Sequence, residues 1–171
     1  MEASLVNEFG FKQVSVANWL KVDPAWGGFI MSSSLSDPSE AWVHDLAEFQ
    51  LNTAIPLPVR RLFEVARGAM AYSLMFYPLL TLGSEQLLRV METAVSEKCK
   101  ALSAPVLSNY SRQVDWLVKQ EVIPTNESER WKALIQLRNA ASHPADQTIM
   151  PPGWALDFMK TTTELINGLF P

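Results

Sequence analysis

A long uncharged segment in the first half of the chain limits the folds that it can adopt. Residues 68–84, GAMAYSLMFYPLLTLGS, contain no Asp, Glu, Lys or Arg and lie between Arg67 and Glu85. This length is at the lower limit of what a helix needs to cross a bilayer, and Pro78 interrupts the segment. We therefore expect a buried core helix that kinks or ends near Tyr77 and Pro78, and not a membrane span.

Helical spacing of apolar residues continues from Val59 onward, and no segment alternates as a strand would. After the uncharged segment, we expect helices over about residues 84–102, 108–121, 125–143 and 153–168. The side chains expected to face the core are Leu88, Met91, Val95 and Leu102 in the first of these, and Val114, Leu117 and Val118 in the second. Short connections between such helices favour an all-α fold, an up-down helical bundle of about four to five main helices.

The start of the chain has a different character. The first ~35 residues mix aromatic residues with Gly, Ser and Pro without a sustained period, and the N-terminal arm is expected to cover residues 1–55. We expect an irregular N-terminal arm with short helices, one near Val16–Lys21 and one over about residues 37–50. The second begins with Asp37-Pro38-Ser39-Glu40, which combines a capping acid, a proline at the first helical position and a glutamate three residues after the cap. Residues 56–171 then form the bundle.

A similar start signal marks the helix expected over residues 125–143. Thr125 or Asn126 can cap it, and Asn126 and Glu129 have the spacing of a capping box. Pro144 predicts that it ends at or just before His143, because the residue before a proline is biased away from the helical conformation.

Composition supports one folded domain. The chain has 171 residues, 48% of them apolar and 19% charged, which excludes disorder of the whole chain. One cysteine, Cys99, and two histidines are too few for a disulfide scaffold or a usual structural zinc site, and we expect no cofactor and no metal. The N-terminus has neither a basic leader nor a long apolar run, so we expect no secretory signal and a cytoplasmic location.

Charge is distributed unevenly along the chain. The formal charge is −4, yet residues 1–48 alone hold seven acids and two bases, whereas residues 60–138 hold eleven bases and eight acids. This mild positive balance permits local contacts with RNA phosphates without arguing for them, and an ordinary solvated surface is the simpler explanation of it. The bases considered for one common groove are Arg60, Arg61, Arg67, Arg112, Lys119, Arg130 and Lys132.

An arginine occupies a core position in the helix expected over residues 125–143. Trp131, Leu134 and Ile135 form an apolar stripe, and the next member of that stripe is Arg138. A buried guanidinium is costly unless a carboxylate or a ligand phosphate pairs with it, although a snorkelling stem is an alternative.

Two glutamates, Glu85 and Glu92, are candidate partners of this arginine. They lie seven residues apart and share one face of the helix expected over residues 84–102. Glu85 can instead pair with Arg89 at the surface, so Glu92 is the preferred buried partner.

His143 follows Arg138 by five residues, which in a regular helix separates the two side chains by about 140°. Asn139 and His143 share a face, and a frayed helix end or a second copy of the chain can bring His143 to Arg138. A helix C-terminus favours imidazolium, which suits acid or base chemistry, but a histidine there can also serve only as a C-cap. The other histidine, His44, has no matching neighbours and is expected at the surface.

Other catalytic templates are missing from the sequence. There is no GxSxG, no P-loop and no dinucleotide fingerprint, and Cys99 lies in an apolar helix without a histidine beside it.

The sequence Arg138-Asn139-Ala140-Ala141-Ser142-His143 resembles the R-x4-6-H motif of the HEPN superfamily. The motif ends an amphipathic helix, and its first two residues close the helix–turn–helix run LVKQEVIPTNESERWKALIQLRN. The LLRVMETAV helix with its glutamate precedes it. The resemblance covers about residues 59–170.

This resemblance implies a compact α-helical bundle, commonly a homodimer, and a metal-independent endoribonuclease. Many HEPN proteins act in toxin–antitoxin, phage-defence or RNA-processing systems, so an antitoxin or a nucleotidyltransferase partner is also implied. Arg138 would contact the scissile phosphate, His143 would act as general acid or base, and Asn139 would orient the pair or bind phosphate. Glu92, with Glu85 as the second candidate, would position Arg138. Attack by the ribose 2′-hydroxyl would leave a 2′,3′-cyclic phosphate and restrict the substrate to RNA.

Two other functions stay open at the level of sequence. One is a non-catalytic helical module of the same fold that binds RNA or a partner protein. The other is a small-molecule-binding bundle that uses the aromatic residues between Tyr72 and Tyr77, although such residues more often form core.

Overall fold

The computed structural model describes residues 6–8, 10–27, 38–133 and 150–171. Its helices are the 3-10 helix η1 (Pro24–Trp26), α2 (Pro38–Glu48), α3 (Leu57–Tyr72), α4 (Pro78–Ala101), α5 (Tyr110–Lys119), the 3-10 helix η2 (Thr125–Glu127) and α7 (Pro152–Leu169). Residues 128–133 are also helical. These ranges contain no β-strand, and the nearest approach to one is an isolated antiparallel bridge between Val6 and Lys12. The prediction of an all-α helical bundle with an irregular N-terminal region is confirmed.

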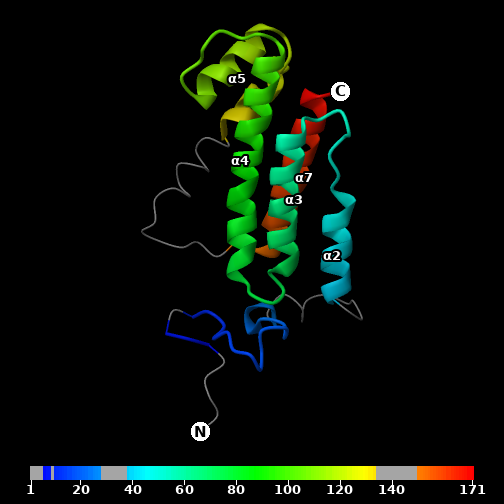
Figure 1. The fold of residues 1–171 in the computed structure, drawn as a ribbon, viewed down its shortest axis with the longest axis vertical. Helices are drawn as coiled ribbons and strands as arrows, with labels where there is room; N and C mark the ends of the chain where they lie inside the picture. The colour runs from blue at the N-terminus through cyan, green and yellow to red at the C-terminus, as the bar shows by residue number, and fades with distance from the viewer. Residues whose placement is uncertain (1–5, 9, 28–37, 134–149) are drawn as a thin grey trace.

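The centre of the fold is a hairpin of α3 and α4 (Figure 1). α2 packs on α3, and α7 and α5 pack on α4. In Figure 1, α2, α3 and α4 run alternately up and down, and α7 runs in the same direction as α4. The last turn of α4 and the start of α3 therefore lie at one end of the bundle, together with α5.

A glycine allows α3 and α4 to approach closely. A Cβ atom added to Gly83 of α4 would lie 2.5 Å from the side chain of Met70 and 3.0 Å from the carbonyl oxygen of Ala66, both in α3. Real Cβ atoms essentially never lie within 3.0 Å of such an atom, so the contact with Met70 cannot form without a shift. The hairpin packs at this distance because position 83 has no side chain.

The uncharged segment forms the tip of this hairpin. α3 ends at Tyr72 and α4 begins at Pro78, so the expected break near Tyr77 and Pro78 is present. The expectation that the next helix begins near Ser84 was wrong, because Pro78 occupies the first turn of α4, where a missing N–H costs nothing. Among the described residues, no helix combines the length and the apolar character needed to cross a membrane.

One hydrophobic core joins these helices. Leu88, Met91 and Val95 of α4 are buried as expected, but Leu102 is 43% exposed because it caps the end of α4 instead of continuing its stripe. The largest side chains with almost no exposure are Trp131, Phe63, Leu46, Ile55, Met70, Leu80, Leu87, Met91, Leu117, Ile123, Met159 and Ile166.

The segment after α4 begins with a well-capped helix. The side chain of Asn109 accepts a hydrogen bond from the backbone N–H of Arg112 at 3.0 Å and so caps α5. Val114 and Leu117 are buried, whereas Val118 is half-buried. The side-chain cap expected at Thr125 or Asn126 was wrong: Pro124 precedes the 3-10 helix η2, which has no side-chain cap and leads into the helix at residue 128.

Residues 10–27 of the N-terminal arm lie against the tip of the α3–α4 hairpin, whereas α2 lies beside α3 (Figure 1). Trp26 Nε1 donates to the carbonyl oxygen of Ser73 at 2.8 Å, and Trp42 Nε1 donates to that of Met70 at 2.9 Å. The carboxylate of Asp23 accepts from the backbone N–H of Tyr77 at 2.8 Å. Both tryptophans thus donate to carbonyl oxygens at the end of α3, and Asp23 accepts from a backbone N–H at the start of α4, where such groups lack a carbonyl partner within the helix.

The arm is also fixed by a buried lysine. Lys12 is 4% exposed, and its Nζ donates to the carbonyl oxygens of Lys21 at 2.6 Å and Met75 at 2.7 Å. The helix expected at Val16–Lys21 was wrong, because this stretch forms turns in which the Asn18 side chain bonds the backbone of its neighbours. The first helical turn of the arm is instead η1, capped by Asp23.

Candidate functional site

The residues predicted to carry the chemistry are divided between two parts of the chain. Arg138, Asn139 and His143 lie outside the described residues. The two candidate supporting carboxylates, Glu85 and Glu92, both lie on α4. The candidate site is therefore built from α4 and from the elements that face it.

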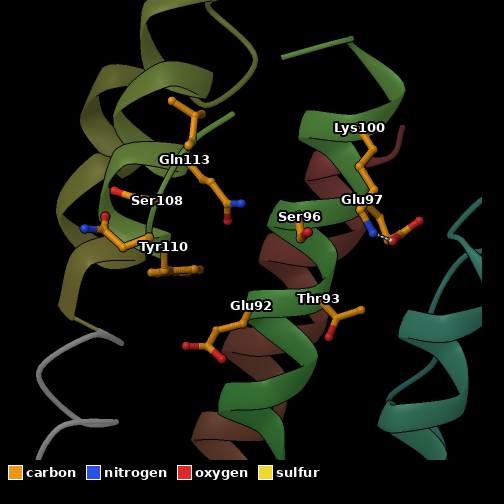
Figure 2. A pocket seen from close by; sticks show the side chains of 10 residues that line it. Glu92, Thr93, Ser96, Glu97, Lys100, Ser108, Tyr110 and Gln113 are labelled. Atoms are coloured by element: carbon orange, nitrogen blue, oxygen red, sulfur yellow. Dashed lines mark hydrogen bonds and ion pairs between the residues drawn. The ribbon is translucent and has the colours of Figure 1, made fainter. Parts of the chain in front are cut away.

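Glu92 lines a cleft of about 420 Å³ between the second half of α4 and the start of α5 (Figure 2). It is half-buried, because it lies next to the buried Met91 and Val95 at the edge of the face that α4 turns to the core. The residues that line the cleft are Glu92, Thr93, Ser96, Glu97, Lys100, Leu107, Ser108, Asn109, Tyr110 and Gln113.

Tyr110 is the residue opposite Glu92. Figure 2 shows the Glu92 side chain pointing toward it across the cleft. Burial first, and then the negative charge of Glu92, raise the pKa of Tyr110 above its ordinary value of 10. The phenol thus stays protonated at neutral pH, and its hydroxyl donates to the carbonyl oxygen of Trp131 at 3.4 Å.

This arrangement links α4 to the helix that begins at residue 128. Trp131 is 1% exposed. It is the first residue of the apolar stripe whose next position was predicted to hold Arg138. Through Tyr110, the Glu92 cleft is in contact with the beginning of that helix. Sequence reasoning chose Glu92 but missed Tyr110, which had no recognisable signal beyond its place after a capping asparagine.

Glu85 lies about two helical turns before Glu92 on α4 and does not line the cleft. It is half-buried, and in the described part of the chain it forms no ion pair with Arg89, the surface partner considered for it. Of the two carboxylates, Glu92 is therefore the one that lines this cleft.

Apart from Leu107, the remaining lining of the cleft is polar. Thr93, Ser96, Glu97 and Lys100 have the spacing of one helical face, a sequence signal that could have identified this wall of the cleft. Lys100 Nζ and Glu97 Oε1 form an ion pair at 2.7 Å, drawn as a dashed line in Figure 2. Hydroxyl, amide and carboxylate groups in this number can bind a polar ligand by hydrogen bonds.

The described residues contain no cluster of three or more His, Cys, Asp or Glu side chains suited to a metal ion. Cys99 is buried in α4, and burial raises the pKa of its thiol, which makes it a poor nucleophile. His44 is exposed on α2 and lies 3.8 Å from the carboxylate of Glu48. Both residues are therefore placed as the sequence predicted.

The seven bases considered for one groove are spread over three places. Arg60, Arg61 and Arg67 lie on α3, Arg112 and Lys119 on α5, and Arg130 and Lys132 in the helix at residues 128–133. The last two have carboxylate partners: Lys132 lies 3.0 Å from Asp115, and Arg130 lies 3.6 Å from Glu164 and 4.0 Å from Glu127. Only the three bases of α3 line a common cavity among those described.

The aromatic residues considered for a small-molecule site are likewise separated. Tyr77 is 5% exposed and packs edge-on against Trp26 with ring centroids 5.4 Å apart, whereas Tyr72 is 69% exposed. Neither residue lines the Glu92 cleft.

Comparisons with protein-family models, with curated proteins and with solved structures gave no match to this chain.

Proposed function

We propose that this chain is a metal-independent endoribonuclease of the HEPN type that cleaves RNA by attack of the ribose 2′-hydroxyl. The observation that carries the proposal is the sequence Arg138-Asn139-Ala140-Ala141-Ser142-His143 in an all-α bundle whose α4 presents Glu92 to a polar cleft. Arginine and histidine supply the two functions that this reaction needs, stabilisation of phosphate charge and proton transfer.

In the proposed reaction, His143 takes the proton of the 2′-hydroxyl or gives one to the leaving 5′-oxygen. Arg138 donates hydrogen bonds to the phosphate oxygens on which charge develops, and Asn139 orients the pair. Glu92 holds Arg138. The products are a 2′,3′-cyclic phosphate and a 5′-hydroxyl end, and the enzyme acts in the cytoplasm as a homodimer whose second copy brings His143 to Arg138.

The test is incubation of the purified protein with total cellular RNA in EDTA, with analysis of the product ends. His143→Ala and Arg138→Ala should each lower the cleavage rate by about 100-fold or more, in the range that one acid–base group supplies. His44→Ala removes the only other histidine, which is exposed on α2, and should cleave at the wild-type rate. Glu92→Gln should reduce cleavage more than Glu85→Gln does.

Cleavage that persists in both His143→Ala and Arg138→Ala would contradict the proposal. Intact RNA with the wild-type protein favours the second candidate function, a non-catalytic module that binds RNA or a partner protein. Within that candidate, the pairing of Arg67, Arg130 and Lys132 with carboxylates of the same chain leaves fewer bases for a nucleic acid and so favours a partner protein.

A further inference from the structure

A second cavity, of about 360 Å³, lies between the first half of α3 and the segment that connects α2 to α3. Its charged lining residues are Arg60, Arg61, Arg67 and Glu64, which leaves an excess of two positive charges. We call this cavity the arginine groove. It shares no lining residue with the Glu92 cleft.

Backbone carbonyl groups hold two of these guanidinium groups in place. Arg60 Nε donates to the carbonyl oxygen of Ile55 at 2.9 Å, and Arg67 Nη1 donates to that of Phe49 at 3.5 Å. Arg67 also pairs with Glu64. A tethered guanidinium has already lost part of its side-chain entropy, so a ligand that binds it incurs a smaller ordering cost.

The tethers leave positive charge available. Arg60 is bonded to a neutral carbonyl group, and Arg61 is exposed on α3. In the described part of the chain, neither has a carboxylate partner. The natural ligand for two adjacent, unneutralised guanidinium groups is an anion with several acceptor oxygens, such as a phosphate, which matches their fork of N–H donors.

The groove also has an apolar part. Leu51 and Leu57 line it, and Leu57 is 48% exposed. Its volume is within the range of sites for small organic groups. A ligand that combines phosphate charge with a flat, partly apolar group fits this lining better than a simple ion does, and a nucleotide unit has that combination.

We propose that the arginine groove binds the phosphodiester backbone of the RNA substrate at a position outside the cleavage site. The inference rests on the proposed function for the identity of the ligand. The groove is formed by the first half of α3, and the Glu92 cleft by the second half of α4. Since α3 and α4 run in opposite directions (Figure 1), the helix segments that line the two cavities lie toward the same end of the bundle.

The test measures binding separately from cleavage. The probe is a fluorescent single-stranded RNA with 2′-O-methyl groups, which cannot attack the phosphate, and affinity is followed by anisotropy over a series of salt concentrations. Arg61→Gln is the main variant, because the Arg61 side chain makes no hydrogen bond or ion pair in the described part of the chain and its loss should leave the fold intact. Lys160→Gln, an exposed position of α7 outside the groove, is the control with equal loss of charge.

Arg61→Gln should weaken binding roughly fivefold at 0.1 M salt and lower the slope of log affinity against log salt by about 0.7, the value for one phosphate contact on a single strand. Arg60→Lys should weaken binding as well, because lysine retains the positive charge but lacks the planar pair of N–H donors with which a guanidinium binds a phosphate. Lys160→Gln should leave affinity and slope near wild type.

Two results would overturn the inference: no binding of the probe by the wild type, or an equal effect of Arg61→Gln and Lys160→Gln. Cleavage of unmodified RNA, measured in parallel, separates this outcome from the failure of the proposed function. Binding that depends on Arg61 without cleavage upholds the groove and rejects the nuclease. Cleavage with no dependence of binding on Arg61 upholds the nuclease and rejects the groove.

Discussion

Tyr77 is the residue at which the N-terminal arm, the α3–α4 turn and the start of α7 meet. Its backbone N–H donates to Asp23, its ring packs against Trp26, and its hydroxyl donates to the carbonyl oxygen of Met150 at 2.8 Å. Burial, and then the charge of Asp23, raise the pKa of Tyr77 from 10 to about 12. The folded protein therefore holds this proton more tightly than the unfolded chain does.

This difference predicts a loss of stability in alkaline solution. Between about pH 10 and pH 12, the unfolded chain releases the Tyr77 proton while the folded protein keeps it, so the free energy of unfolding falls as pH rises. Tyr77→Phe should be less stable than wild type at neutral pH, where it lacks the bond to Met150, yet should lose less stability across this window. Urea denaturation at a series of pH values measures the free energy of unfolding of the two proteins at neutral pH and its change in alkaline solution. If this free energy fell equally with pH in wild type and in Tyr77→Phe, the prediction would be refuted.

At the level of single residues, sequence alone identified candidate side chains but not the residues that they contact. Glu92 was chosen because it adjoins the apolar stripe of α4, and it does lie half-buried at the edge of that face. Tyr110, opposite Glu92, and Asp23, bonded to Tyr77, belong to contacts between distant segments. Spacing along one helix contains no information about such contacts, because they depend on how the helices pack.

Gly83 controls the spacing of the two central helices. Gly83→Ala should destabilise the protein by about 1–3 kcal/mol, because the added methyl group meets the Met70 side chain and the Ala66 carbonyl oxygen. Gly68→Ala in α3 is the matched control: its Cβ meets nothing within 4 Å, so the better helix propensity of alanine should stabilise the protein by about 0.5–1 kcal/mol. Thermal and urea denaturation measure these opposite signs, and equal effects of the two substitutions would be inconsistent with close packing at Gly83.

Helices were predicted better than their ends. The segment expected over residues 108–121 is α5, Tyr110–Lys119, and the last expected helix is α7, Pro152–Leu169. Pro78 was recognised as a break, but a proline that ends one helix can equally open the next, and only the packing of α4 on α3 decides between these roles. Leu102 shows the same limit at the other end of α4, where the helix stops before its apolar pattern does.

At the scale of the molecule, the described parts of the arm and of the bundle share one core. Residues 1–55 were predicted as a separate arm, and the described part of this region contributes Trp26, Trp42 and Leu46 to the same buried cluster as α3 and α4. Through the two tryptophan Nε1 atoms, the arm also donates hydrogen bonds to backbone carbonyl oxygens at the end of α3. Composition indicated that the arm is irregular. Its role in the core depends on hydrogen bonds between residues that are 28 and 47 positions apart in the sequence, which composition does not reveal.

Because of this shared core, we expect the described arm and bundle to unfold together. Trp26→Ala should lower the free energy of unfolding by about 3–5 kcal/mol, since it removes a large buried ring that contacts Trp42 at 5.0 Å between centroids, together with a buried hydrogen bond. Trp19→Ala, at a position that is 56% exposed in the same arm, should cost far less. Urea denaturation followed by near-ultraviolet and by far-ultraviolet circular dichroism should give coincident transitions in wild type and in both variants. Two separate transitions, or equal losses of stability in the two variants, would instead indicate an arm that folds independently of the helices.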